Sequence, residues 1–190
     1  MPDLIRCFIA VEISRPVLVE IEEYINQLRP LASNIRWTKT SGMHVTLKFL
    51  GEIPESQVES VKDRLAPIRL PHQAFNLTAQ GSGFFPSRNN PRIIWIGLDQ
   101  DEERSLFRIH QWVDDVMEPL NFQREKRRFS PHITVGRVKN PGNFTKLISY
   151  LEANPFPATT FSVDSVNLMR SRLKPEGAEY SVLESYPLRG

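Results

Sequence analysis

The sequence has 190 residues, of which 40% are hydrophobic and 24% are charged, and its formal net charge is +2. These values are typical of a globular protein that buries a sizeable core. The single cysteine, Cys7, excludes an internal disulfide, and the four histidines lack the spacing of a structural zinc site. No segment approaches the roughly 20 apolar residues of a membrane span, and the N-terminus lacks a signal-peptide pattern. We therefore expect a cytoplasmic protein without a metal or cofactor.

The first half of the chain alternates strand and helix patterns. An apolar run at residues 4–11 indicates a strand, and residues 14–28 carry apolar side chains at helical spacing. The remaining expected elements of this half are strands at 35–38 and 44–50, a helix at 58–68, an extended segment at 75–85, a polar loop at 86–91 and a strand at 92–98.

The second half repeats this order, with helices at about 102–117 and 144–151 and extended segments at 161–169 and 179–183. A shift of 88 positions aligns His44 with His132 and Phe8 with Ile96. We expect an α+β fold in which residues 1–190 form a single bilobal domain with an internal repeat. Two small, mainly antiparallel sheets would face a central cleft and carry their helices on the outer faces.

The repeat contains a short motif in each copy, His44-Val45-Thr46-Leu47 and His132-Ile133-Thr134-Val135. Side chains alternate between the two faces of a strand, so the histidine and threonine of each copy point the same way. The aliphatic residues between and after them point to the opposite face, into the core. Two such strands that face each other would form a site with two imidazoles and two hydroxyls.

This residue set suits reactions at phosphorus. Near neutral pH one imidazole can remove a proton from an attacking water or hydroxyl while the other donates a proton to the leaving oxygen. The hydroxyls of Thr46 and Thr134 can donate hydrogen bonds to the phosphate oxygens as negative charge develops. This chemistry needs no metal ion, and the residues alone do not say which histidine is the acid.

The other two histidines, His72 and His110, have different surroundings. His72 follows Pro71 in an expected loop, and His110 lies beside the apolar face of an expected helix. We interpret both as structural. A single His-x-Thr in a strand is also commonly structural, but two copies with apolar flanks at equivalent positions of a repeat favour function.

Both motifs resemble the paired HxTx motifs of the two-histidine phosphoesterase superfamily. Two longer segments, His44-Val-Thr-Leu-Lys-Phe-Leu-Gly-Glu52 and Phe129-Ser-Pro-His-Ile-Thr-Val-Gly-Arg137, resemble its RNA 2′,3′-cyclic phosphodiesterase branch, also called the 2′-5′ RNA ligase family. The segments Arg6-Cys7-Phe8-Ile9-Ala10 and Leu168-Met-Arg-Ser-Arg-Leu173 extend the resemblance over nearly the whole chain.

The resemblance implies hydrolysis of an RNA 2′,3′-cyclic phosphate to a 2′-phosphomonoester, with reversible 2′-5′ RNA ligation as a further family activity. By analogy His44 would be the proton donor to O3′, and His132 the proton acceptor that activates water. Arg137 matches a family arginine that assists at the phosphate. Strict alternation would turn Arg137 away from the face of His132, so a bend near Gly136 is needed.

Several roles stay open at this point. Lys48 is an even number of residues from His44, so on a regular strand both side chains would point to the same face. Lys48 could therefore contact phosphate or be a solvated residue at the strand end. The segment Arg124–Arg128 could bind the RNA backbone or be a solvated loop. Four aromatic residues could either stack on a base of the substrate or pack in the core, namely Phe8, Trp37, Phe49 and Phe84.

The nature of the substrate also stays open. The alternatives to RNA hydrolysis are a cyclic phosphodiesterase for a small nucleotide, such as an ADP-ribose cyclic phosphate, and a non-catalytic module that binds RNA or nucleotides. We expect a monomer that does not associate with a membrane. Its partner would be an RNA or nucleotide that bears a 2′,3′-cyclic phosphate.

Overall fold

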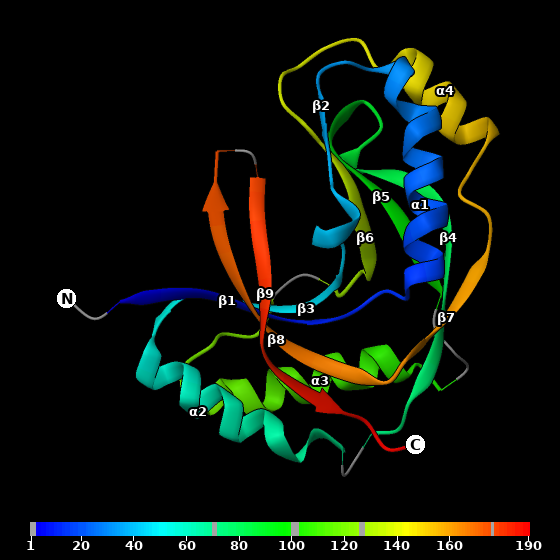
Figure 1. Cartoon of the computed structure of the whole chain (residues 1–190). Helices are drawn as coiled ribbons and strands as arrows, with labels where there is room; N and C mark the ends of the chain where they lie inside the picture. Colours follow the sequence, from blue (N-terminus) through cyan, green and yellow to red (C-terminus); the bar gives the residue numbers. More distant parts are fainter. Residues whose placement is uncertain (1–2, 70–71, 100–102, 126–127, 176) are drawn as a thin grey trace.

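The computed structural model describes residues 3–69, 72–99, 103–125, 128–175 and 177–190, and its strands form two sheets (Figure 1). Sheet A has the strand order β3-β1-β8-β9, and sheet B has the order β2-β6-β5-β4-β7. Neighbouring strands are antiparallel in both sheets. The strands are β1 (Leu4–Val11), β2 (Ile35–Trp37), β3 (Val45–Pro54), β4 (Phe75–Ser87), β5 (Asn90–Asp99), β6 (His132–Val138), β7 (Thr159–Val163), β8 (Ser165–Lys174) and β9 (Gly177–Pro187).

Each sheet is covered by helices on one face only. Helices α2 and α3 lie against sheet A, and α1 and α4 lie against sheet B, so that the uncovered faces turn toward each other (Figure 1). We call the uncovered faces the inner faces. The helices are α1 (Arg15–Leu28), α2 (Glu55–Leu65), α3 (Ser105–Met117) and α4 (Thr145–Ala153), and short 3-10 turns are η1 (Arg29–Leu31), η2 (Thr40–Gly42), η3 (Ala66–Arg69) and η4 (Glu118–Leu120).

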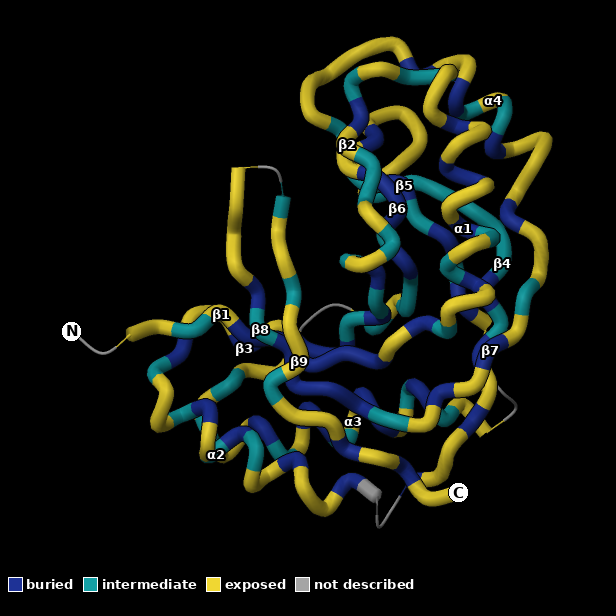
Figure 2. The backbone as a smooth tube through the Cα atoms, in the orientation of Figure 1, coloured by how far each residue is buried: buried dark blue, intermediate teal, exposed yellow. Residues whose placement is uncertain are grey.

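The apolar stripe of each helix packs into one continuous core that also takes the outer side chains of both sheets (Figure 2). In β1, alternation sends Cys7, Ile9 and Val11 into this core. Phe8 and Ala10 point to the inner face, where they form a separate small cluster with Met169. The inner face of sheet A is therefore partly apolar even though no helix covers it.

The two lobes do not correspond to the two halves of the sequence. Helix α1 belongs to the first half but covers sheet B, and α3 belongs to the second half but covers sheet A. Strand β4 of the first half likewise lies in sheet B, while β8 and β9 return the end of the chain to sheet A. Each lobe thus combines segments from both copies of the repeat.

The expected α+β class with two antiparallel sheets and outer helices is confirmed. Two local expectations differ from the structure. Residues 86–91 were expected to be a polar loop, but β4 continues to Ser87 and β5 begins at Asn90, so a tight hairpin joins them. Residues 161–169 were expected to be one extended segment, yet Asp164 separates β7 from β8, which lie in different sheets. None of the described helices is long and apolar enough to cross a membrane.

Candidate active site

His44 lies immediately before β3, between aromatic side chains of the inner face of sheet A. Its ring centroid is 4.6 Å from that of Phe8 and 5.0 Å from that of Tyr180. Burial is the main cause that lowers the pKa of His44, to about 4, and the charge of Arg137 lowers it further. The backbone of Gly42, two residues earlier, acts in the opposite direction because its hydrogen bond favours the protonated ring.

His132 is the first residue of β6 in sheet B. Like His44, it interacts with the backbone of the residue two positions earlier. Its Nδ1 is 2.8 Å from the carbonyl oxygen of Ser130, which is also two residues before the histidine. A carbonyl only accepts hydrogen bonds, so Nδ1 carries the proton and Nε2 of the neutral ring is left with a free lone pair. The ring also contacts Phe85 edge-on, at 5.0 Å between centroids. This geometry allows Nε2 to accept a proton.

The threonines lie on the inner faces, as the alternation predicted. Thr46 pairs with Ala10 on β1, and Thr134 pairs with Trp95 on β5. Both are partly exposed, whereas the aliphatic residues beside them, Val45 and Ile133, are buried in the core. Each sheet therefore presents one imidazole and one hydroxyl from the same strand.

Both motif strands contain a β-bulge at the equivalent position. The pairing with the neighbouring strand skips Leu47 in β3 and Val135 in β6, each three residues after its histidine. A bulge reverses the alternation beyond it, so the residue five positions after each histidine points to the inner face. These residues are Phe49 and Arg137, and both are exposed.

The bulge in β6 provides the bend that was expected near Gly136. A Cβ atom at Gly136 would lie 2.9 Å from Cγ2 of Ile35 and 3.1 Å from Cε3 of Trp37. Only glycine fits there without displacing β2, which pairs with β6 at this point. Arg137 consequently projects from the inner face of sheet B, near enough to His44 for its charge to affect that ring.

A short connection joins the two motif strands across the lobes. Strand β2 pairs with β6, and the amide of Thr38 donates a 2.9 Å hydrogen bond to the carbonyl of Val135. The chain then passes through η2 and Met43 to His44. This path fixes the first histidine beside the strand that carries the second motif.

The sequence and fold were compared with those of known proteins. A family model described as the 2′-5′ RNA ligase superfamily matches residues 17–175. The chain belongs to the 2′-5′ RNA ligase superfamily. The resemblance inferred from the motifs is thereby confirmed, including its extent over most of the chain.

Curated relatives match the chain over nearly its full length. The chain is 30% identical over 186 residues to the RNA 2′,3′-cyclic phosphodiesterase of Thermotoga maritima, a match that spans 97% of this chain and 96% of the relative. It is 30% identical over 183 residues to the protein of the same name from Archaeoglobus fulgidus, with coverage of 95% and 99%.

Solved structures agree with the fold. The crystal structure of TT0787 of Thermus thermophilus superposes with a TM-score of 0.81 at 27% identity and covers 97% of this chain and 98% of that one. The structure of E. coli LigT complexed with 3′-AMP gives a TM-score of 0.81 at 21% identity, with coverage of 99% and 100%. At that identity the second likeness supports the fold alone.

Lys48 was expected to contact phosphate or solvent, and both expectations are wrong. The bulge at Leu47 turns Lys48 to the helical side of sheet A, where its side chain is buried. There it forms an ion pair with Asp114 of α3 and donates a 2.8 Å hydrogen bond to the carbonyl of Gln123. Lys48 thus ties the first motif strand to the segment that leads toward the second.

The structure separates the four aromatic candidates for base stacking. Trp37 and Phe84 pack against the main core. Phe8 is buried but contacts the ring of His44, and Phe49 is 64% exposed on the inner face. Tyr180 and Phe85, which contact the two histidines, were not predicted, because each comes from a strand that no local pattern links to the motif.

The remaining polar candidates lie outside the pair of motifs. Arg124 forms ion pairs with Asp115 and Glu118 on the surface, while residues 126 and 127 of the basic segment lie outside the described residues. His72 and His110 are buried, and burial lowers the pKa of both rings. The described residues contain no group of three or more His, Cys, Asp or Glu side chains that could hold a metal ion.

Proposed function

We propose that the chain is an RNA 2′,3′-cyclic phosphodiesterase that works without a metal ion, by acid–base catalysis with His44 and His132. The main support is the arrangement of two equivalent strands, each with an inward histidine and threonine, on facing sheets of a member of this superfamily. The proximity of Arg137 to His44 adds a cation at the point where a phosphate would lie. The names of the curated relatives agree with this activity.

In the proposed reaction His132 removes a proton from a water molecule through Nε2, and the water oxygen attacks phosphorus. The bond between phosphorus and O3′ breaks, and His44 donates a proton to O3′. The product is a 2′-phosphomonoester with a free 3′-hydroxyl. Thr46, Thr134 and Arg137 bind the non-bridging oxygens as charge develops on them. Each proton transfer contributes roughly 10²–10⁴-fold to the rate.

The donor role of His44 depends on the substrate. With a pKa of about 4 in the unliganded protein, His44 is neutral at pH 7. A cyclic phosphate carries a negative charge, which would offset the charge of Arg137 and favour the protonated ring. We propose that binding of the phosphate raises the pKa of His44, so that the ring enters the reaction protonated.

The assignment of the two roles can be tested with a substrate that has sulfur in place of O3′. A thiol, with a pKa of about 8.5, is much more acidic than a ribose hydroxyl and leaves without a proton. The sulfur substrate should therefore restore turnover by His44→Ala and leave His132→Ala inactive. Rescue of His132→Ala alone would reverse the assignment.

The reaction itself is tested by the product. Wild-type protein in EDTA should convert an RNA oligonucleotide with a 2′,3′-cyclic phosphate to the 2′-phosphate, identified by chromatography against both isomers. Formation of the 3′-phosphate, or a requirement for added metal, would contradict the proposal. We also propose that the protein acts as a cytoplasmic monomer, and that an RNA 5′-hydroxyl can replace water as the nucleophile. Its attack on the cyclic phosphate breaks the bond between phosphorus and O3′ and forms a 2′-5′ phosphodiester, a reaction that can run in reverse.

A further inference from the structure

We propose that a hollow beside His132 on sheet B binds the 5′-terminal nucleoside of an acceptor RNA. The acceptor is the strand whose 5′-hydroxyl attacks the cyclic phosphate of a donor RNA in place of water. This inference rests on the proposed function and extends it, because it places the second RNA of the joining reaction. It predicts variants that lose joining but keep hydrolysis.

The hollow has a volume of about 630 Å³. This lies within the range of about 300–1,000 Å³ that is typical of pockets for small molecules. Residues of β4 and β5 and of the segments before β6 and β7 line it, and none of the described lining residues comes from sheet A. Ile96 of β5 is buried in the core, so its neighbours Trp95 and Gly97 point to the inner face of sheet B.

The hollow is continuous with the second motif. Pro131, which directly precedes His132, lines it, and so does Gly97, the residue that pairs with His132 across β5 and β6. Ser130 also lines it, and the carbonyl of Ser130 is the group that accepts the hydrogen bond from Nδ1 of His132. A ligand in the hollow would therefore lie beside the imidazole that accepts the proton.

The direction of attack separates the two RNAs. In a displacement at phosphorus the incoming and leaving oxygens lie roughly in line, on opposite sides of the phosphorus. O3′ leaves beside His44, so the donor nucleoside lies toward sheet A, where Phe8 and Tyr180 contact that histidine. The 5′-hydroxyl must enter from the side of His132. His132 removes its proton, the 5′-oxygen bonds to phosphorus, and the bond to O3′ breaks as His44 protonates O3′.

The lining suits an uncharged nucleoside. The indole of Trp95 lies against β4, where a Cβ atom at Gly83 would lie 2.9 Å from Cε2 of the ring. Trp95 is partly exposed, so a base can stack on it. Gln80 donates a hydrogen bond to Asp99, and both side chains have further groups that can bind ribose hydroxyls or a base edge. No Lys or Arg is among the described lining residues, and the charge of Asp99 would repel a 5′-phosphate.

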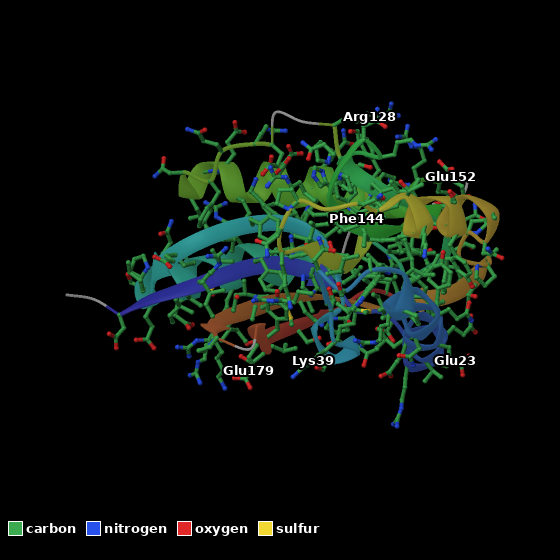
Figure 3. All side chains as sticks on the ribbon, turned by 90° about the horizontal axis from the view of Figure 1, so that it is seen from above. Glu23, Lys39, Arg128, Phe144, Glu152 and Glu179 are labelled. Carbon is green, nitrogen blue, oxygen red and sulfur yellow. The ribbon has the colours of Figure 1, made fainter. Side chains whose placement is uncertain are left out.

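A basic side chain follows the rim of the hollow. Arg128, two residues before Ser130, is exposed. Figure 3 shows Arg128 on the opposite side of the molecule from Glu179, which directly precedes Tyr180 in β9. An acceptor strand that leaves the hollow along Arg128 would therefore lie on a different side of the molecule from the surroundings of His44.

The test measures hydrolysis and joining in one mixture, with a cyclic-ended RNA hexamer as donor and a 5′-hydroxyl RNA trinucleotide as acceptor. Ala158→Phe adds a ring to the wall that the segment before β7 forms. We expect joining to fall at least about tenfold, the worth of one stacked base, and hydrolysis to stay within about twofold of wild type. The control Ala153→Phe adds the same ring to the exposed end of α4, outside the lining, and should leave both rates unchanged.

A second pair of variants tests the stacking surface. Trp95→Leu should lower the ratio of joining to hydrolysis about tenfold, and Trp95→Phe, which keeps an aromatic ring, should retain most of that ratio. The acceptor site would be overturned by an equal decrease of joining and hydrolysis in Ala158→Phe. An unchanged ratio in both Ala158→Phe and Trp95→Leu would overturn it as well.

Binding without turnover separates this inference from the proposed function. The protein is saturated with a hexamer that ends in a 2′-phosphate, and tryptophan fluorescence is recorded while the acceptor trinucleotide is added. Saturable quenching should occur in wild type and disappear in Trp95→Phe, which retains Trp37 and Trp112 as an internal reference. Absence of this quenching in wild type would overturn the acceptor site. Quenching that depends on Trp95, in a protein that does not turn over the donor, would instead overturn the proposed function.

Discussion

Arg137, on the second motif strand, lies close enough to His44, on the first, for its charge to lower the pKa of that imidazole. This electrostatic effect crosses from sheet B to sheet A and depends on the bulge at Val135, which turns Arg137 inward. The equivalent bulge in β3 turns Phe49 inward, so the two halves of the site differ at this position. One side presents a cation and the other an exposed aromatic ring.

We predict that Arg137→Gln raises the pKa of His44 in the unliganded protein. Removing a positive charge makes protonation of the ring less costly, although burial, the larger cause, still holds the pKa below 6.5. An NMR titration of the histidine rings would measure this shift. The same variant should lose about 10²-fold in kcat/KM, because one donor to the phosphate is removed. An unchanged His44 pKa would contradict the electrostatic effect of Arg137 on that ring, and Arg64→Gln is the control for net charge.

The low pKa of His44 also predicts a pH-dependent stability. An unfolded histidine has a pKa of about 6.5, so between about pH 6.5 and 4 the unfolded chain binds more protons than the folded protein. The free energy of unfolding should therefore fall as the pH falls through this window. Urea denaturation measures the free energy of unfolding at pH 7 and at pH 4.5. The decrease in this free energy from pH 7 to pH 4.5 should be about 2 kcal/mol smaller in His44→Gln than in wild type. Equal decreases in both proteins would refute the shifted pKa.

Thr46→Val and Thr134→Val test the hydroxyl contacts without changing the side-chain shape. We expect each variant to lose about 10²-fold in kcat for the cyclic phosphate, because a hydrogen bond that strengthens with developing charge is gone. Thr78→Val is a matched control, since that threonine is on β4 and its hydroxyl bonds to Thr160 at 2.9 Å. If Thr46→Val and Thr134→Val were as active as the control, the threonines would have no role at the phosphate.

The buried ion pair of Lys48 and Asp114 should show strong coupling. Removal of one partner leaves an unpaired buried charge, so Lys48→Met and Asp114→Leu should each lower the free energy of unfolding by about 3–5 kcal/mol. The double variant should be destabilised by clearly less than the two single changes together. Urea denaturation of all four proteins measures this coupling. Additive effects would show that the pair contributes no mutual stabilisation.

The sequence predicted the features that depend on strand alternation and on the repeat. The placement of His44, Thr46, His132 and Thr134 follows from the alternation of side chains between the two faces of a strand. From the sequence we also expected that Arg137 would turn inward only if the strand bends near Gly136. Lys48 was misjudged because nothing in the local pattern marks the matching bulge at Leu47, where no glycine is present.

Other features depend on contacts between distant segments and could not be predicted locally. The repeat indicated two similar units. It did not indicate that α1 would cover sheet B, which carries the second motif, or that α3 would cover sheet A, which carries the first. Tyr180 reaches His44 through the pairing of β9 with β8, which no short-range signal specifies.

The most direct test of the central claim is hydrolysis of a cyclic-ended RNA oligonucleotide in EDTA by wild type, His44→Ala and His132→Ala. His72→Gln serves as a control, because that histidine is buried against Trp112 away from both motifs. We predict that both alanine variants lose at least about 10²-fold in kcat with unchanged circular dichroism, and that the control stays within about twofold. A near-wild-type rate for either His44→Ala or His132→Ala would contradict catalysis by the paired histidines.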